Sequence, residues 1–225
     1  MIELILGDWH ELIGRYDPAL AVVITDPPYG LGAPGEADAR HGLGDSHRGY
    51  VDVIPWRDHV AAVLADLPAM RHAIRGPATA IVGRDYPAPR RLCIEVSAMK
   101  PRARHRLGAV PHMWQAWAIY GRLRIGHRAR PPGGDARVIR PYAARAMARP
   151  AVDLHRAITP LDAAVWITEL WAEPGCVVVD PFAGIGTIAH AARTMGVDYL
   201  GAEISPAWHA EAEAMLATQQ TAWAW

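Results

Sequence analysis

The sequence predicts an α/β protein built on a doubly wound parallel sheet that is covered by helices. Two observations predict this class. Short apolar runs alternate with segments of helical periodicity, most regularly in the last third of the chain. Several of these runs stop abruptly at Gly, Pro or Asp, as strands do where a loop begins. We expect one domain over residues 1–225, because neither an internal repeat nor a clear linker divides the chain.

The first part of the chain already alternates between the two kinds of segment. Apolar runs predict strands, and apolar residues at helical spacing predict helices. A stretch rich in Gly, Asp, His and Arg predicts a mobile loop. In chain order we expect a strand over 2–6, a short helix over 9–14, a strand over 20–25, the loop over 31–50, a helix over 56–71 and a strand over 78–82.

The middle of the chain is harder to interpret, whereas the last third is regular. Between residues 86 and 150 only the run 113–120 favours a strand, and residues 130–135 have loop chemistry. Further on, the same periodicities return. They predict a helix over 162–171, a strand over 176–180, a helix over 187–194, a strand ending at Glu203 and a last helix from about Pro206.

Composition excludes several classes of protein. Apolar residues make up 51% of the chain, yet no stretch approaches 18 uncharged apolar positions, so a membrane span is not expected. The start, from Met1 to Asp8, has no basic region or cleavage site and is typical of a strand rather than a signal peptide. Two cysteines, Cys93 and Cys176, lie far apart, which argues against a zinc site or a disulfide framework and favours a cytoplasmic location.

Charge is distributed very unevenly along the chain. From Lys100 to Arg149 there are 12 Lys and Arg residues against one acid, although the whole chain is formally neutral. Such segregation indicates a surface that faces a polyanion, and an Arg-rich solvated face is the alternative. We therefore expect a basic, polyanion-facing segment at about 100–150, with these candidate contacts: Arg102, Arg104, Arg106, Arg122, Arg124, Arg128 and Arg130.

A glycine-containing loop follows the strand that ends at Asp180. In a doubly wound sheet the ligand lies beyond the carboxyl ends of the strands, and Gly184 and Gly186 let the backbone approach it closely. Glu203 comes 17 residues after Gly186, at the end of the next strand, where an acid binds ribose hydroxyls. Because Ala189 replaces the third glycine of the phosphate-binding fingerprint, a nucleoside without phosphates fits better. The alternative is a loop that serves tight packing only.

The turn Asp26-Pro27-Pro28-Tyr29 lies at the end of an earlier strand, where the same rule places chemistry. The amino group of a base is a poor nucleophile, because its lone pair is conjugated with the ring. A carboxylate and a fixed carbonyl that accept its N–H groups direct that lone pair at an electrophile. Proline stiffens the turn, and the tyrosine ring offers a stacking face for an extruded base. A rigid Pro-Pro turn with a packed tyrosine is the alternative.

D-P-P-Y-G at 26–30 and D-P-F-A-G-I-G-T at 180–187 resemble the two signature motifs of the amino-methylating DNA methyltransferases. The catalytic motif comes first, as in the circularly permuted beta group of the N6-adenine and N4-cytosine enzymes. The resemblance implies a seven-stranded, mostly parallel sheet of the S-adenosylmethionine-dependent methyltransferase type. It also implies that Ile2–Leu6 lies beside the strands near the C-terminus, which requires the two chain ends to be adjacent.

Individual residues follow from the resemblance. Asp26, Pro27, Pro28 and Tyr29 match the amino-group clamp. The segment from His155 to Pro160 resembles the one that grips the methionine end of the cofactor, with Thr159 in place of the family's lysine. The residues that match the binding of S-adenosylmethionine are Asp8, Asp26, Thr159, Pro160, Asp180, Phe182, Ala183, Gly184, Gly186, Thr187, Glu203 and Ile204.

The resemblance implies direct methyl transfer to adenine N6 in double-stranded DNA, with the base flipped out of the duplex. The target amino group is open at this stage: cytosine N4 is the alternative, and an RNA or protein methyltransferase is a more distant one. A non-catalytic DNA-binding module, left from a phage or a restriction–modification system, is a further alternative. With no long recognition domain in the sequence, recognition falls to residues 31–50, to the basic segment or to the second subunit of a homodimer.

Overall fold

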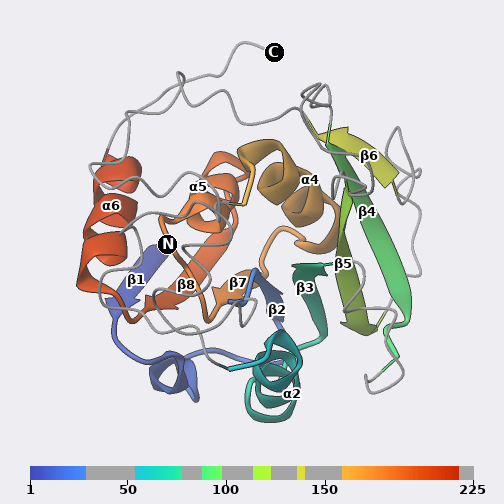
Figure 1. Cartoon of the computed structure of the whole chain (residues 1–225). Helices are drawn as coiled ribbons and strands as arrows, with labels where there is room; N and C mark the ends of the chain where they lie inside the picture. Colours follow the sequence, from blue (N-terminus) through green and yellow to red (C-terminus); the bar gives the residue numbers. More distant parts are fainter. Residues whose placement is uncertain (29–53, 78–87, 98–113, 123–135, 140–158, 218–225) are drawn as a thin grey trace.

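The computed structural model describes residues 1–28, 54–77, 88–97, 114–122, 136–139 and 159–217. Within these ranges, eight strands form one sheet with the order β1-β8-β7-β2-β3-β5-β4-β6 (Figure 1). The strands are β1 Ile2–Leu6, β2 Ala21–Thr25, β3 Arg71–Pro77, β4 Arg91–Ser97, β5 Trp114–Gly121, β6 Ala136–Ile139, β7 Val177–Asp180 and β8 Asp198–Glu203. The helices are η1 Trp9–Leu12, α2 Trp56–Asp66, α4 Leu161–Trp171, α5 Thr187–Thr194 and α6 Pro206–Ala217.

Most neighbouring strands are parallel, as predicted. β5 alone runs against its neighbours β3 and β4, and the other described pairs are parallel. The prediction of a mostly parallel, helix-covered α/β sheet is therefore confirmed. One strand is additional to the seven expected: the short β6 pairs with β4 at the edge of the sheet.

The first strand lies beside the last. β1 pairs with β8 in parallel, from Ile2 opposite Tyr199 to Leu6 opposite Glu203. The N-terminal ammonium group of Met1 also contacts the carboxylate of Asp198. The expectation that Ile2–Leu6 completes the sheet beside the C-terminal strands is thus confirmed. Consequently, a turn near the start of the chain and a loop near its end open at the same edge of one sheet.

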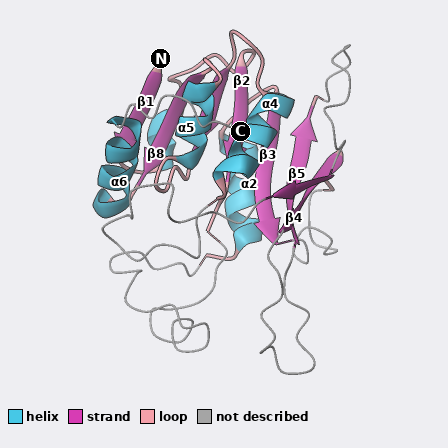
Figure 2. Cartoon of the chain, turned by 90° about the horizontal axis from the view of Figure 1, so that it is seen from above, coloured by secondary structure: helices cyan, strands magenta, loops and turns pink. Residues whose placement is uncertain are grey.

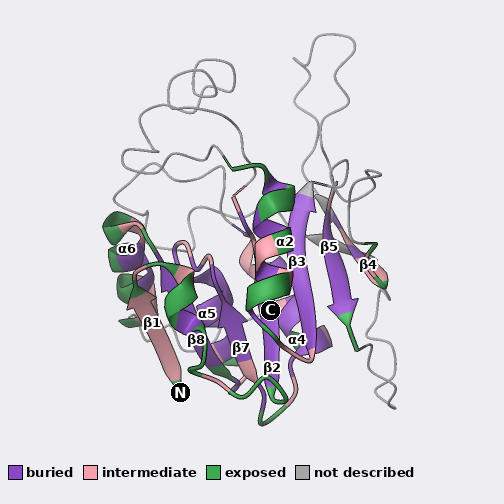
Figure 3. Ribbon diagram, turned by 90° about the horizontal axis from the view of Figure 1, so that it is seen from below, coloured by how far each residue is buried: buried purple, intermediate pink, exposed green. Residues whose placement is uncertain are grey.

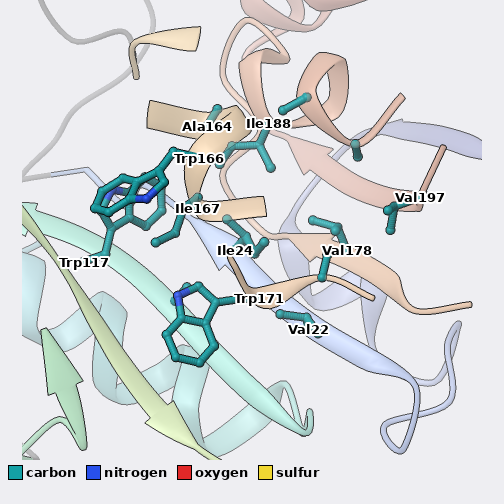
Figure 4. Packing of buried hydrophobic residues seen from close by; sticks show 14 of the residues in the cluster. Val22, Ile24, Trp117, Ala164, Trp166, Ile167, Trp171, Val178, Ile188 and Val197 are labelled. Atoms are coloured by element: carbon teal, nitrogen blue, oxygen red, sulfur yellow. The ribbon is translucent and has the colours of Figure 1, made fainter. Parts of the chain in front are cut away.

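Helices cover both faces of the sheet (Figures 2 and 3). Trp166 and Ile167 of α4 and Ile188 of α5 pack on one face, against residues that include Val22 and Val178 (Figure 4). On the other face the core contains Trp56, Val60 and Val63 of α2 and Leu12 of η1. Because side chains alternate along a strand, β2 places Val22 and Ile24 in the first cluster and Val23 in the second. Burial on both faces explains why β2 is apolar throughout.

The helix predicted over 56–71 ends earlier than expected, at Asp66. Leu67 precedes Pro68 and has a non-helical backbone, because the proline ring disfavours the helical conformation of the residue before it. The chain then enters β3 at Arg71, a strand that was not predicted, and the strand expected over 78–82 lies outside the described residues. β4 and β6 were not predicted.

The other expected elements are confirmed within a residue or two at each end. The two cysteines are buried and form no disulfide. In the described ranges no cluster of side chains suited to a metal ion occurs. None of the described helices has the length and apolar character that crossing a membrane requires.

Candidate active site

Four acidic residues lie at the carboxyl ends of four neighbouring parallel strands. Asp8 follows β1, Glu203 ends β8, Asp180 ends β7 and Asp26 follows β2. Since β1, β8, β7 and β2 are consecutive and parallel, all four acids lie along one edge of the sheet. This is the edge where α/β sheets bind ligands. The sequence predicted all four as site residues, and the topology brings them together.

Asp180 joins the strand that carries the glycine loop to its neighbours. Its carboxylate is fully buried and accepts hydrogen bonds from the hydroxyl of Thr25 on β2 (2.7 Å) and that of Tyr199 on β8 (3.2 Å). The backbone N–H of Phe182 donates to the same carboxylate at 3.2 Å. Burial raises the pKa of Asp180 to about 7, more than these hydrogen bonds lower it, and the charge of Asp26 adds to the rise. Asp180 therefore stabilises the loop through its buried hydrogen bonds, and none of its surface is exposed to contact a ligand.

The glycine loop has the backbone that its sequence predicted. Gly184 and Gly186 have φ angles of +55° and +80°, which side-chain-bearing residues rarely adopt. A Cβ atom at Gly184 would meet nothing within 4 Å, so this part of the loop faces open space. At Gly186 a Cβ would lie 3.0 Å from the Cβ of Ala212 on α6. Glycine is thus needed at the two positions for different reasons. Gly184 borders an opening, whereas Gly186 permits α6 to pack closely.

The remaining loop residues lie where α5 begins. Ala183 is buried, and its N–H donates to the carbonyl of Ala202 on β8 at 2.9 Å. Phe182 contacts His59 of α2 in an edge-to-face arrangement, with 5.1 Å between ring centroids. Thr187 is buried as the first residue of α5.

Glu203 closes the site on the β8 side. Its two oxygens accept hydrogen bonds from the backbone N–H groups of Gly184 and Ser205, each at 2.8 Å. Burial raises the pKa of Glu203, although these backbone donors oppose the rise. The next residue, Ile204, is a large apolar side chain that is 54% exposed. A buried acid next to an exposed apolar surface and an open glycine suits a ligand that has both hydroxyl groups and a flat apolar ring.

Asp8 is the most solvent-exposed of the four acids. Its side chain caps η1 by accepting a hydrogen bond from the N–H of His10 at 2.9 Å, and the His10 ring also contacts it. The pKa of Asp8 is lowered: partial burial would raise it, but the hydrogen bonds and the His10 ring outweigh that effect. The N–H of Gly7 donates to the carbonyl of Glu203 at 3.0 Å, which fixes Asp8 beside the end of β8.

Asp26 is held by side chains from two other elements. Its Oδ2 accepts hydrogen bonds from Nη1 of Arg75 on β3 at 2.8 Å and from the hydroxyl of Thr159 at 2.6 Å. Only 11% of the Asp26 side chain is exposed. Thr159 precedes Pro160, the N-cap of α4. Thr159 was expected at the methionine end of the cofactor; the structure places its hydroxyl on the clamp carboxylate.

Arg75 and its partner Glu95 were missed by the sequence reasoning. The Arg75 Nε and Nη2 atoms donate to the Glu95 carboxylate at 3.0 and 2.8 Å, and the indole N–H of Trp117 also donates to Glu95. All three side chains are buried. The available signal was a charged residue within each of two partly apolar segments, 71–77 and 91–97, since such a residue needs a buried partner.

The remaining predicted site residues lie at the start of the Asp26 turn, at the end of β5 or outside the described residues. Pro27 is buried and Pro28 partly buried at the start of the turn. Tyr29 and the loop 31–50 lie outside the described residues. Arg122 is exposed at the end of β5, where its backbone N–H donates to the carbonyl of Met70 at 3.0 Å. The other arginines predicted to contact DNA also lie outside the described ranges, namely Arg102, Arg104, Arg106, Arg124, Arg128 and Arg130.

The strand order, the glycine loop and the acids at the carboxyl edge define an α/β protein with the fold of S-adenosylmethionine-dependent methyltransferases. Residues 111–214 match the model of a DNA methylase family that comprises N6 and N4 methyltransferases. The chain is similar to this N6/N4 DNA methylase family over that range. The matched range includes the glycine loop and excludes the Asp26 turn. A search of curated proteins finds no match.

Solved structures of such enzymes share the fold over nearly the whole chain. The complex of M1.HpyAVI with SAM aligns with a TM-score of 0.61 at 17% identity, covering 96% of this chain and 100% of that one. The PvuII DNA methyltransferase, described as cytosine-N4-specific, has a TM-score of 0.66 at 16% identity, covering 98% and 88%. A putative DNA modification methylase from Thermus thermophilus, complexed with S-adenosyl-L-methionine, has a TM-score of 0.55 at 18% identity, covering 95% and 92%. Likenesses at this level of identity show the fold alone.

Proposed function

We propose that this protein transfers a methyl group from S-adenosylmethionine to adenine N6 in double-stranded DNA. One observation carries the proposal: Asp26 and the glycine loop after Asp180 follow neighbouring parallel strands, β2 and β7. The hydrogen bond from Thr25 to Asp180 ties the two turns together at 2.7 Å. A nucleophile held at one turn therefore lies close to a ligand held at the other.

The residues of the glycine loop fit a nucleoside cofactor. Gly184 borders open space, Glu203 offers a buried carboxylate beside it, and Ile204 presents an exposed apolar side chain for an adenine ring. Asp8 and Phe182 complete the predicted set. S-adenosylmethionine, when bound there, would supply an electrophilic methyl group.

Asp26 acts on the amino group of the base. Its carboxylate accepts one N–H, and the carbonyl of Pro27, fixed by the proline ring, accepts the other. The lone pair of the nitrogen is then directed away from the ring, and the carboxylate stabilises positive charge that develops on the nitrogen. In this proposal Tyr29 stacks on the flipped base. Asp26 forms an ion pair with Arg75, with 2.8 Å between Oδ2 and Nη1.

The choice of adenine over cytosine depends on the first residue of the clamp, since Asp is commoner in the adenine enzymes that this motif resembles. Cytosine N4 is the second candidate, and the PvuII enzyme, with the same fold, is described as cytosine-N4-specific. Segments 31–50 and 100–149 supply recognition and phosphate contacts in this proposal, with a second subunit as a further source. Two reduced, buried cysteines are consistent with a cytoplasmic protein.

A labelled-methyl assay with DNA, RNA and protein as parallel substrates tests the proposal. We expect label in DNA, and mass spectrometry of the digested DNA is expected to identify N6-methyladenine. Asp26→Ala is expected to lower the rate by roughly 100-fold or more, as removal of a transition-state hydrogen-bond partner does, while S-adenosylmethionine still binds. Asp66→Ala, at an exposed position on α2, serves as the control and is expected to keep the wild-type rate.

Other results of these assays would indicate a different target base, a different substrate or a non-catalytic protein. N4-methylcytosine as the product would replace the proposed target and leave the mechanism intact. Label in RNA or protein alone would contradict a DNA substrate. Binding of DNA without calorimetric binding of S-adenosylmethionine would favour a non-catalytic DNA-binding module.

A further inference from the structure

The carboxylate of Asp26 is the last member of a series of hydrogen-bonded, charged side chains. The other two members are Arg75 of β3 and Glu95 of β4. Thr25 of β2 lies opposite Ile74 of β3, so the next residue of each strand, Asp26 and Arg75, are neighbours at the edge of the sheet. The carboxylate of Glu95 on β4 accepts hydrogen bonds from Nε and Nη2 of Arg75. Arg75 is 5% exposed and Glu95 4% exposed, so both groups are removed from water.

We propose that Arg75, fixed by Glu95, is a positioning residue that holds the Asp26 carboxylate in place and aims it at the target amino group. This inference rests on the proposed function. Oδ2 of Asp26 accepts both the Arg75 and the Thr159 hydrogen bonds, at 2.8 and 2.6 Å. Two donors from different elements at one oxygen fix the rotation of the carboxylate plane. A carboxylate fixed in this way is preorganised for a single geometry of the base nitrogen.

The burial of Asp26 explains why a partner is needed. Only 11% of the Asp26 side chain is exposed, and Asp180 approaches it from β7. A nearly buried carboxylate requires hydrogen-bonded partners, and the contact with the Arg75 guanidinium supplies one.

Glu95 holds the guanidinium in place. A bidentate pairing with Nε and Nη2 leaves Nη1 directed at Asp26, because the guanidinium is planar and its donors have fixed directions. The indole N–H of Trp117, which is fully buried, fixes Glu95 in turn. The register of the antiparallel strands brings Trp117 opposite both Arg75 and Cys93, so the three strands arrange this chain of contacts before any substrate binds.

The test uses a double variant, since removing Arg75 alone would leave Glu95 buried without its cation and endanger the fold. In Arg75→Met/Glu95→Gln, both buried charges are removed and the glutamine carbonyl still accepts the Trp117 N–H. We expect a folded protein that binds S-adenosylmethionine within about 2-fold of wild type, with kcat for DNA methylation lowered roughly 10- to 1000-fold. The KM for DNA is expected to change by less than about 3-fold, because an interaction that acts mainly in the transition state affects kcat rather than ground-state binding.

Two further variants separate positioning from fold stability. Arg71→Met removes another buried arginine of β3, one that donates to the carbonyl of Trp171, and is expected to lower stability and to leave kcat within about 2-fold of wild type. Thr159→Val is expected to lower kcat, because the second donor to Oδ2 of Asp26 is lost, and Thr159→Ser is expected to restore the rate.

The outcomes distinguish the two proposals. A folded double variant with the wild-type kcat would overturn the role of Arg75, while methylation by the wild type would still support the proposed function. An equal loss of kcat in Arg71→Met would also overturn it, because the effect would then not be specific to Asp26. If the wild type methylates no DNA, the proposed function fails and the positioning role fails with it.

Discussion

At the scale of single residues, the candidate site is built from acids whose surroundings differ. Asp26 has an arginine partner, Glu203 accepts two backbone N–H groups, and Asp180 is fully buried among hydroxyl groups. These surroundings assign different tasks to chemically similar side chains. Asp180 supports the loop, whereas Glu203 and Asp26 border the space where ligands are proposed to bind.

The raised pKa of Asp180 predicts a pH-dependent stability. Its pKa is about 7 in the folded protein and 3.8 for the free side chain. Between these values the folded state binds a proton that the unfolded state does not, so the free energy of unfolding falls as pH rises, by about 1 kcal/mol per pH unit at most. Asp180→Asn removes this dependence. We expect wild type to lose stability relative to Asp180→Asn between about pH 4 and 7.

Chemical denaturation at a series of pH values measures this difference, with Asp66→Asn as an exposed control that sets the background. A stability difference between wild type and Asp180→Asn that is constant with pH, or that grows in favour of wild type, would show that Asp180 is not protonated near neutrality in the folded protein.

The open space at Gly184 predicts a selective loss of cofactor affinity. Gly184→Ala adds a methyl group where nothing lies within 4 Å, next to Glu203. The positive φ costs about 1 kcal/mol of stability, and we expect the Kd for S-adenosylmethionine to rise roughly 10-fold or more. Gly196→Ala is the matched control: it has a φ of +67° and open space, but lies in the turn before β8, away from the site. Equal affinities of the two variants by calorimetry would contradict the assignment of the loop.

At the scale of elements, the glycine loop also determines how α6 packs. A Cβ at Gly186 would lie 3.0 Å from that of Ala212 and 3.4 Å from the Cε of Met215. Gly186→Ala is therefore expected to cost about 1 kcal/mol more stability than Gly196→Ala, since overpacking adds to the backbone strain. Adding Ala212→Gly removes the close contact. We expect a double-mutant cycle on the free energy of unfolding to give a favourable coupling of about 0.5 kcal/mol or more, and additive effects would contradict the packing argument.

Elements with a short apolar run or a helical periodicity were the ones that could be predicted from sequence. β2, β7 and β8 are short apolar runs, and α4 and α5 have helical periodicity. β3 and β4 escaped prediction because they contain Arg75 and Glu95, which become compatible with burial only when the fold pairs them. Sequence patterns show each charge separately and contain no information on a pairing across two strands.

In the candidate site, residues at the ends of strands could be predicted from sequence, whereas residues within strands could not. The glycine loop and the four acids follow strand ends, so the rule for parallel sheets found them. Arg75 and Glu95 lie within strands, where no such rule applies. Thr159 was assigned to the cofactor from a family motif, and this stays a prediction; the hydrogen bond from its hydroxyl to Asp26 could not be predicted, because it depends on where α4 starts relative to β2.

At the scale of the whole molecule, one sheet joins the two ends of the chain. β1 completes the sheet beside β8, and β2 lies beside β7, so segments separated by some 155 positions share one edge. The clamp residue comes from the N-terminal segment and the glycine loop from the C-terminal one. The proposed chemistry therefore requires the fold as a whole, since neither segment alone contains both parts.

Methylome sequencing tests this account most directly. A host whose own DNA methyltransferases have been removed would express wild type or Asp26→Ala at equal levels, with Asp66→Ala as the control. We predict N6-methyladenine at one recognition sequence in DNA from the wild-type and Asp66→Ala strains, and none above background in the Asp26→Ala strain. Equal methylation in the wild-type and Asp26→Ala strains, or unmodified DNA in all three, would contradict the claim that the Asp26 turn and the glycine loop form one methyl-transfer site.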